Sequence, residues 1–225
     1  LKNYVAVEGG AARITAATAP LIAIPTTAGT GSEVGRGAVL ILDDGRKLGI
    51  LSPFIVPKVA ICDPELTVGM PPAITAGTGM DALAHCLEAY CSPFYHPMGE
   101  GIAVEGIRLV KDALPRAYKN GRDLEARAHM MSAAAMGATA FQKGLGAIHA
   151  LSHPVGALHD THHGMTNAVF MPYVLQFNRS AIEAKIERLA AFIGLPPKFD
   201  AFLQWILDLR KELGVPHTLK EFGVE

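Results

Sequence analysis

The chain has 225 residues, of which 50% are hydrophobic and 18% are charged, and its formal net charge is −1. A chain of this length can bury a sizeable core, as one large domain or as two small ones. The balanced charge excludes a polybasic nucleic-acid binder, an acidic tail protein and a disordered chain, and no apolar run reaches the length of a membrane span. We therefore expect a globular protein with neither a nucleic-acid nor a membrane partner.

The cysteines and the N-terminal residues bear on the cellular compartment. Cys62, Cys86 and Cys91 include no CxxC pair, which supports neither a disulfide framework nor a thiolate zinc site. The first residues lack the basic and apolar layout of a signal peptide. We expect buried free thiols in a cytoplasmic protein.

Residues 1–69 are predicted to form strands and turns. Short apolar runs of the kind found in strands lie at residues 21–24, 38–42, 47–51 and 58–62. Residues 43–46, with the sequence Asp-Asp-Gly-Arg, fit a hairpin turn between the second and third of these runs. The first run is followed by a Thr/Gly-rich loop, in which Thr26, Thr27 and Thr30 offer hydroxyl groups to a cofactor. A plain turn is the alternative interpretation of that loop.

From residue 70 onward the pattern changes to long segments rich in Ala, Leu and Met with helical spacing. Prolines and glycines at the expected ends predict helices over residues 73–91, 98–118, 122–141, 145–158, 165–179, 181–193 and 198–213. In the last of these, Phe202, Trp205, Ile206 and Leu209 form an apolar stripe, which we interpret as part of the core. The chain is thus predicted to divide near Met70 into a small α/β part and an all-helical part.

Five of the nine histidines lie between Gly144 and Gly164. His149 and His153 are four residues apart, so on a helix their rings project from the same face. A later histidine stands directly before Gly164, where the chain can turn back. This clustering predicts a metal site, with scattered, solvated histidines as the alternative. Spacing alone does not select the ligands among His149, His153, His159, His162 and His163.

A second pair of donors lies upstream. Asp81 and His85 are four residues apart on a predicted helix, and Glu88 follows about one turn later near the same face. The apolar neighbours of this pair argue against a wholly exposed helix face. One carboxylate with several imidazoles suits Fe(II), Zn(II), Ni(II) or Co(II) better than Mg or Ca. Four ligands suffice, which leaves one histidine for proton transfer beside the metal.

Four segments in a fixed order resemble a known family. They are PTTAGTGSE at residues 25–33, GMPP at 69–72, GMDALAH at 79–85 and GLGAIHALSHP at 144–154. Together they span most of the chain and resemble the iron-containing (group III) alcohol dehydrogenases. The histidine of the third motif, His85, favours these enzymes over the related glycerol dehydrogenases, which lack it.

The resemblance implies an α/β remnant of a dinucleotide-binding domain over residues 1–69, followed by an all-α helical metal-binding domain over residues 70–225. Catalysis would take place in the cleft between them. The implied reaction is NAD- or NADP-linked oxidation of a small alcohol, or reduction of an aldehyde. The implied metal is Fe(II), with Zn, Ni or Co also possible, and the implied assembly is a homodimer.

The resemblance also implies roles for individual residues. The metal ligands would be Asp81, His85, His149 and His163. The catalytic residue would be His153, a histidine near the nicotinamide and substrate that does not bind the metal. The cofactor-binding residues would be Thr26, Thr27, Thr30 and Lys47. Residues 140–143, just before the second histidine-bearing helix, are candidates for lining the substrate pocket, where Lys143 would favour an anionic substrate.

The chain departs from the family pattern at both ends. The Gly-Gly-Gly-Ser phosphate-binding turn, which belongs upstream of the Thr motif, is absent, and the chain stops before the family's last helices. We therefore expect an internal fragment of a longer protein. Two alternatives are a metal-dependent hydrolase or lyase, which would not need the Thr loop, and a metal-binding fragment that does not turn over substrate.

Overall fold

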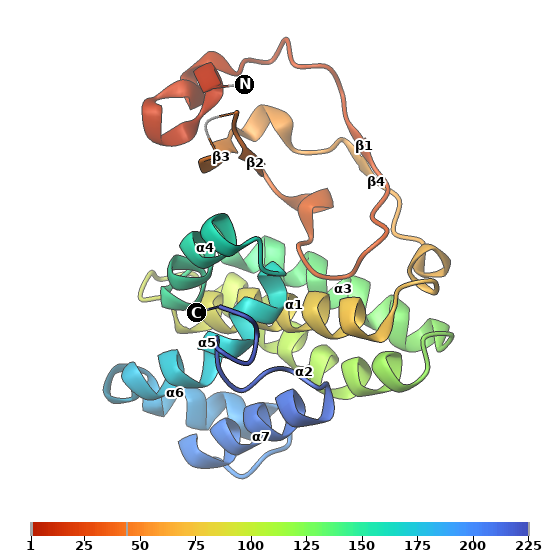
Figure 1. The fold of residues 1–225 in the computed structure, drawn as a ribbon, viewed down its shortest axis with the longest axis vertical. Coiled ribbons are helices and arrows are strands. Elements are labelled where there is room, and N and C mark those ends of the chain that lie inside the picture. The colour runs from red at the N-terminus through yellow and green to blue at the C-terminus, as the bar shows by residue number, and fades with distance from the viewer. Residues whose placement is uncertain (1, 44, 225) are drawn as a thin grey trace.

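A computed structural model describes residues 2–43 and 45–224. A helical body begins at Pro72, and the strands and loops of the N-terminal part lie on one side of it, above α1, α3 and α4 (Figure 1). The chain thus changes from strands to helices close to residue 70, as the sequence predicts. No helix in the described part of the chain is long and apolar enough to cross a membrane.

The described residues of the N-terminal part form two small sheets. β1 (Ile22–Ala23) pairs in parallel with β4 (Val59–Ala60), and β2 (Gly37–Ile41) pairs with β3 (Lys47–Leu51) in antiparallel register. Each strand lies within or overlaps a predicted apolar run. The turn between β2 and β3 includes residue 44, which lies outside the described residues.

Residues 2–13 differ from the expectation of strands and turns. They contain three short 3-10 helices, η1 (Lys2–Tyr4), η2 (Ala6–Glu8) and η3 (Gly10–Arg13). Gly9 has a φ of 76°, a left-handed conformation that reverses the chain between the second and third turns. This segment is rich in Ala and Gly and lacks the alternation of β-branched residues that a strand requires.

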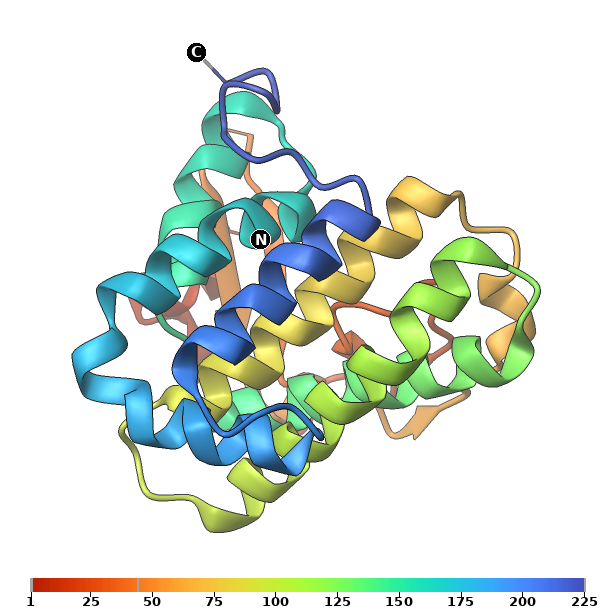
Figure 2. The same ribbon diagram turned by 90° about the horizontal axis from the view of Figure 1, so that it is seen from below.

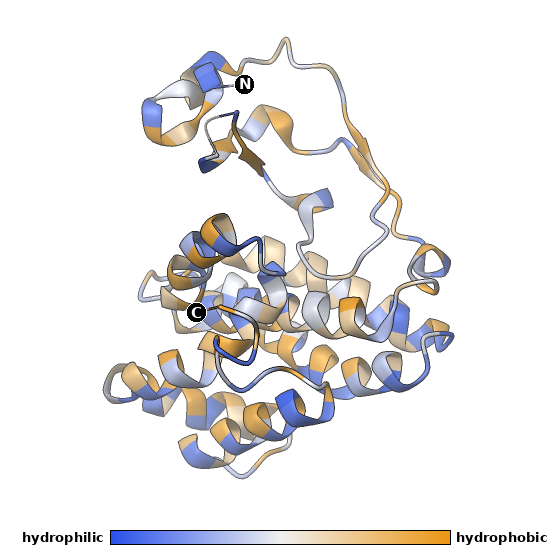
Figure 3. Ribbon diagram, in the orientation of Figure 1, coloured by the Kyte–Doolittle hydropathy of each residue, from blue (hydrophilic) through white to orange (hydrophobic). Residues whose placement is uncertain are grey.

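Seven α-helices follow in the described part of the chain, and each begins and ends within two residues of the predicted range. They are α1 (Pro72–Cys91), α2 (Pro97–Lys119), α3 (Leu124–Ala140), α4 (Ala147–His159), α5 (His163–Phe177), α6 (Arg179–Phe192) and α7 (Phe199–Glu212). Orange and blue residues alternate around α2 and α7, as amphipathic helices require (Figure 3). The predicted stripe on α7 belongs to the core: Phe202, Ile206 and Leu209 are buried, and Trp205 packs against them.

Helix α1 is the central helix of the body. Most of its residues are buried against α2, α3 and α5, and it runs across the middle of the body in the view from below (Figure 2). It approaches α5 so closely that a Cβ on Gly164 would collide with the carbonyl oxygen of Gly77. A helix buried on all sides has no solvated face, so any polar side chain on it must find partners within the protein. Asp81, His85 and Glu88 are such side chains.

Lys143 binds carbonyl oxygens at the C-terminal end of α1, and this corrects the expectation that it binds an anionic substrate. Its side chain is 0% exposed, and its ammonium lies 3.0 Å from the carboxylate of Glu100. The Nζ atom donates to the carbonyl oxygens of Ala89 at 3.0 Å and of Ser92 at 2.7 Å. These carbonyls belong to the last turn of the helix and its cap, where no amide of the helix is left to pair with them. Lys143 is therefore a structural cation that a substrate does not reach.

Candidate metal centre

Three helices bring the predicted donors together. α1 supplies Asp81 and His85, α4 supplies His149, and the first residue of α5 supplies His163. The side chains of Asp81, His85 and His149 are 7%, 5% and 4% exposed, whereas that of His163 is 28% exposed. The site is thus buried on the α1 and α4 sides and opens to solvent beside His163.

The donor atoms converge on one carboxylate oxygen. The Nε2 atoms of His85, His149 and His163 lie 3.8, 3.7 and 3.5 Å from Oδ1 of Asp81. Donor atoms of Asp81, His85 and His149 all lie within 4.8 Å of one another. A tetrahedral ion bound at about 2.1 Å holds its ligand atoms roughly 3.4 Å apart. The three distances to Asp81 Oδ1 are close to this spacing, whereas His163 lies outside the group whose donor atoms are all within 4.8 Å. One carboxylate and three imidazoles also form a donor set that borderline metals accept.

The charges around the site favour a cation. Burial alone would raise the pKa of Asp81, but His85, His149 and His163 together hold it well below its usual value. Burial lowers the pKa of His85 and lowers that of His163 to about 4. Burial would also lower the pKa of His149, but the carboxylates of Asp81 and Glu88 raise it to about 9. The site therefore stabilises an ionised carboxylate, two neutral imidazoles and a positive charge at His149, which a bound metal ion can supply instead of a proton.

The structure separates the three histidines that lie between residues 159 and 163. His159, the last residue of α4, is exposed. His162 caps α5, because its Nδ1 accepts a hydrogen bond of 3.3 Å from the backbone N–H of Met165. Only His163 of the three extends its ring toward Asp81, so the structure places it, and not His162, with the other predicted ligands.

Asn167 belongs to the site, although no sequence motif points to it. Its amide is completely buried, and its Nδ2 donates to Oδ1 of Asp81 at 2.8 Å. The same nitrogen lies 3.2 Å from Nε2 of both His149 and His163. Its position was available as a signal, because Asn167 follows His163 by four residues and so shares its helix face.

His153 stands beside the four donors without joining them. Its ring stacks on that of His163, with 5.2 Å between centroids, and meets the ring of His149 edge-on at 5.8 Å. Burial lowers the pKa of His153, and the positive charges of His149 and Lys47 lower it further. Lys47 reaches this region from β3: a Cβ built on Gly156, one turn after His153 on α4, would lie 3.8 Å from its Nζ.

The predicted threonine loop lies against α1, close to Asp81. Thr26, Thr27 and Thr30 are exposed, and the loop begins at the carboxyl end of β1, which is parallel to β4. Cofactors bind at this end of parallel strands in open α/β sheets. The loop is fixed to the helical body through its glycines, since a Cβ on Gly29 would meet Thr78 at 2.8 Å. Thr78 precedes Asp81 by one turn, so the loop and Lys47 flank the histidine cluster.

Comparison with known sequences assigns this arrangement to a family. A sequence model described as "Fe-containing alcohol dehydrogenase family, C-terminal" matches residues 75–225, and one described as "Iron-containing alcohol dehydrogenase" matches residues 1–64. The chain belongs to the iron-containing alcohol dehydrogenase family. Its α/β remnant and all-α part correspond to the two parts of that family, as the motifs predicted.

Individual relatives among the iron-containing alcohol dehydrogenases are similar over nearly the whole chain. A 4-hydroxybutyrate dehydrogenase of Cupriavidus necator is 50% identical over 233 residues, which cover 100% of this chain and 61% of the relative. An NAD-dependent methanol dehydrogenase of Bacillus methanolicus is 41% identical, over 92% of this chain and 56% of the relative. The chain therefore spans a little over half the length of these relatives.

A solved structure shares the fold. The crystal structure of a sulfoacetaldehyde reductase from Bifidobacterium kashiwanohense in complex with NAD+ superposes with a TM-score of 0.88 at 35% identity. The match covers 94% of this chain and 56% of the reductase. The fold of this chain is thus shared with the matching part of the reductase.

Proposed function

We propose that this chain carries the metal site and part of the nucleotide site of an NAD(P)-linked, metal-dependent alcohol dehydrogenase. Residues 70–225 would form the metal-binding domain, and residues 1–69 the adjoining part of the dinucleotide-binding domain. The main support is the convergence of Asp81 and three imidazoles on one buried point within a fold of this family. The iron of the family name makes Fe(II) the first metal to test, with Zn, Ni and Co as alternatives.

The chain's own residues would bind and orient the reactants. Asp81, His85, His149 and His163 would hold a divalent cation, which when bound supplies Lewis acidity toward the substrate oxygen. Phe141 lies against the ring of His85 with 5.0 Å between centroids and shields that imidazole from water. A nicotinamide would accept or deliver the hydride.

His153 would move the proton. Its ring packs against those of His149 and His163. Among the described residues it makes no ion pair with Asp81 like those of the proposed ligands, so its ring nitrogens would be available to the substrate. Thr26, Thr27 and Thr30 would contact the cofactor from the loop after β1, and Lys47 would contact it from β3. A small alcohol would enter beside His163, the most exposed of the four proposed ligands.

The relative of 50% identity guides the choice of substrate. Its name makes 4-hydroxybutyrate the first compound to test, followed by uncharged primary alcohols of the same length. Since Lys143 is buried, its replacement is not expected to change any preference for the carboxylate.

The test is the metal content of anaerobically purified protein, measured by plasma mass spectrometry. We expect about one equivalent of iron or zinc per chain in the wild type and in the control His129→Ala, and its loss in His149→Ala. His153→Ala should keep the metal but lower kcat by about 10²–10⁴-fold. Failure of the wild type to bind Fe(II) or Zn(II) after reconstitution would refute the proposal. Metal binding without saturable binding of a dinucleotide would favour a hydrolase or lyase.

A further inference from the structure

Glu88 occupies an unusual position at the back of the histidine cluster. Its side chain is 5% exposed, and it lies two turns after Asp81 on α1. One carboxylate oxygen, Oε2, lies 2.6 Å from Nδ1 of His149. The other, Oε1, accepts a hydrogen bond of 2.6 Å from the backbone N–H of Ile148. Both oxygens are therefore engaged by consecutive residues of the first turn of α4.

These contacts determine which nitrogen of His149 can bind a metal. A nitrogen that faces a carboxylate oxygen at this distance carries the hydrogen, so Nδ1 of His149 is the donor. On the opposite side of the ring, Nε2 points toward Asp81 Oδ1 at 3.7 Å. When a metal ion replaces the proton on Nε2, Glu88 thus holds the tautomer in which Nε2 presents its lone pair to the donor cluster, and it fixes the rotation of the ring.

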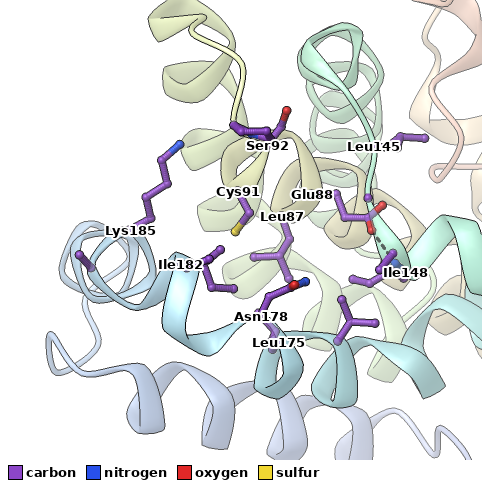
Figure 4. Close-up of a pocket in the computed structure, with 16 residues that line it drawn as sticks. Leu87, Glu88, Cys91, Ser92, Leu145, Ile148, Leu175, Asn178, Ile182 and Lys185 are labelled. Atoms are coloured by element: carbon purple, nitrogen blue, oxygen red, sulfur yellow. Dashed lines mark hydrogen bonds between the residues drawn. The ribbon is translucent and has the colours of Figure 1, made fainter.

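The surroundings of Glu88 strengthen the contact. Figure 4 shows its carboxylate beside the start of α4, at the wall of a cavity of about 560 Å³. The lining of this cavity includes the apolar side chains of Leu87, Leu145 and Ile148. A hydrogen bond to a charged group in such a setting is stronger than in water. The negative charge also lies at the N-terminal end of α4, where the helix dipole favours it.

The backbone of α4 is adapted to this carboxylate. Gly146, which precedes the first residue of α4, passes so close that a Cβ built on it would lie 3.0 Å from Oε1. Any larger residue there would press on the carboxylate. Glu88 therefore links the α1 helix to the first turn of α4, and its position depends on the glycine.

From these contacts we propose that Glu88 is a positioning residue for the metal site. It orients His149 and fixes its tautomer, and it does not itself bind the ion, because both of its oxygens are engaged on the far side of the imidazole. This inference rests on the proposed metal-binding function. It adds to the four proposed ligands a side chain that acts through one of them.

The experiment compares Glu88→Gln and Glu88→Ala with the wild type. Glu100→Gln is the matched control. Glu100 is a carboxylate on α2 that pairs with Lys143 and Lys185, and not with His149. Zn(II) affinity is measured by competition with a chromophoric chelator, and the visible spectrum of Co(II)-loaded protein reports the geometry of the ligands. Circular dichroism checks that each variant is folded.

We expect Glu88→Ala to weaken Zn(II) binding by about 10–100-fold and to alter the Co(II) spectrum. Glu88→Gln should lose less, since its amide oxygen can still accept one of the two hydrogen bonds, and its similar shape preserves the packing if the alanine variant does not fold. Glu100→Gln should bind Zn(II) as the wild type does. A folded Glu88→Gln protein with wild-type affinity and spectrum would overturn the inference alone. A wild type that binds no metal would overturn the proposed function as well.

Discussion

The imidazole of His149 meets a carboxylate on each side of its ring, Glu88 at Nδ1 and Asp81 at Nε2. This is the arrangement in which one nitrogen is held by a hydrogen bond while the other is free to act as a ligand. The sequence showed Glu88 near the face of Asp81 and His85 but gave it no role. Such a role depends on how far α4 lies from α1, and only the packing of the two helices determines that distance.

Two adjacent histidines allow a matched prediction. His163→Ala should lose metal, because it removes a donor that lies 3.5 Å from Asp81 Oδ1. His162→Ala should keep the metal but lower the free energy of unfolding by about 0.5–2 kcal/mol, because it removes the side chain that caps α5. Metal analysis and thermal melting of the two variants check this. Loss of metal in the His162 variant and its retention in the His163 variant would contradict the assignment.

Some of the site residues could be predicted from the sequence and others could not, and the difference has physical reasons. Asp81 and His85, and likewise His149 and His153, stand four apart, so helical periodicity alone places each pair on one face. The choice between His162 and His163 depends on where α5 begins, which periodicity leaves open to within two residues. Asn167 shares a helix face with His163, but one amide at that spacing is common on helices, so its contacts with donor atoms of three proposed ligands appear only in the structure.

At the scale of secondary-structure elements, α1 and α5 pack so closely that Gly164 leaves no room for a side chain. Gly164→Ala should move α5 away from α1, because the new Cβ would collide with the carbonyl oxygen of Gly77 and lie 3.0 Å from Cβ of Asp81. We expect the free energy of unfolding to fall by about 1–3 kcal/mol. Metal affinity should fall as well, since His163 moves with the helix.

The matched control is Gly101→Ala in α2, where an added Cβ meets nothing within 4 Å. This change should leave metal affinity unchanged and raise the stability of the helix by up to about 1 kcal/mol. Thermal melting and chelator competition measure both effects. If both alanine variants behaved alike, the close approach of α1 and α5 would not be a constraint on the site.

The helices were predictable because the sequence marks their ends. Pro72, Pro97, Gly194 and Gly214 stand within two residues of the observed boundaries, and the Ala-rich interiors of α1 and α3 favour helix. The short 3-10 turns before Ile14 were not predictable in the same way, because they lack both a repeating pattern and strong stop signals. A long periodic segment contains enough information to predict its own secondary structure, whereas the structure of a short turn depends on its contacts with the rest of the protein.

At the scale of the whole molecule, the sequence predicted two unlike parts but not how they meet. The threonine loop is fixed to α1 and α3 by glycines: a Cβ on Gly29 would meet Thr78, and one on Gly31 would collide with Ala134. When segments more than forty residues apart approach closely, the only sign in the sequence is a glycine at the contact. Glycines also occur for many other reasons, so this sign does not identify the contact. The relation of the cofactor loop to the metal site is therefore a finding of the structure.

The three cysteines differ in their exposure to solvent, and the expectation that all are buried is wrong for one of them. Cys62 follows β4 and is exposed, whereas Cys86 is buried in α1 and Cys91 is intermediate at its end. Burial raises the pKa of Cys86 and of Cys91 to about 12. Because the thiolate is the reactive form, these two thiols should be nearly inert at pH 8.

We therefore expect one rapidly reacting thiol per native chain with a chromogenic disulfide reagent at pH 8, and three after unfolding in guanidinium chloride. Burial and the charge of Glu33 also raise the pKa of Cys62, so even this thiol should react more slowly than a free cysteine. Cys62→Ser should remove the rapid phase and leave two thiols that react only on unfolding. Rapid reaction of a second thiol in the native protein would mean that the end of α1 opens to solvent, and with it the segment that Lys143 holds in place.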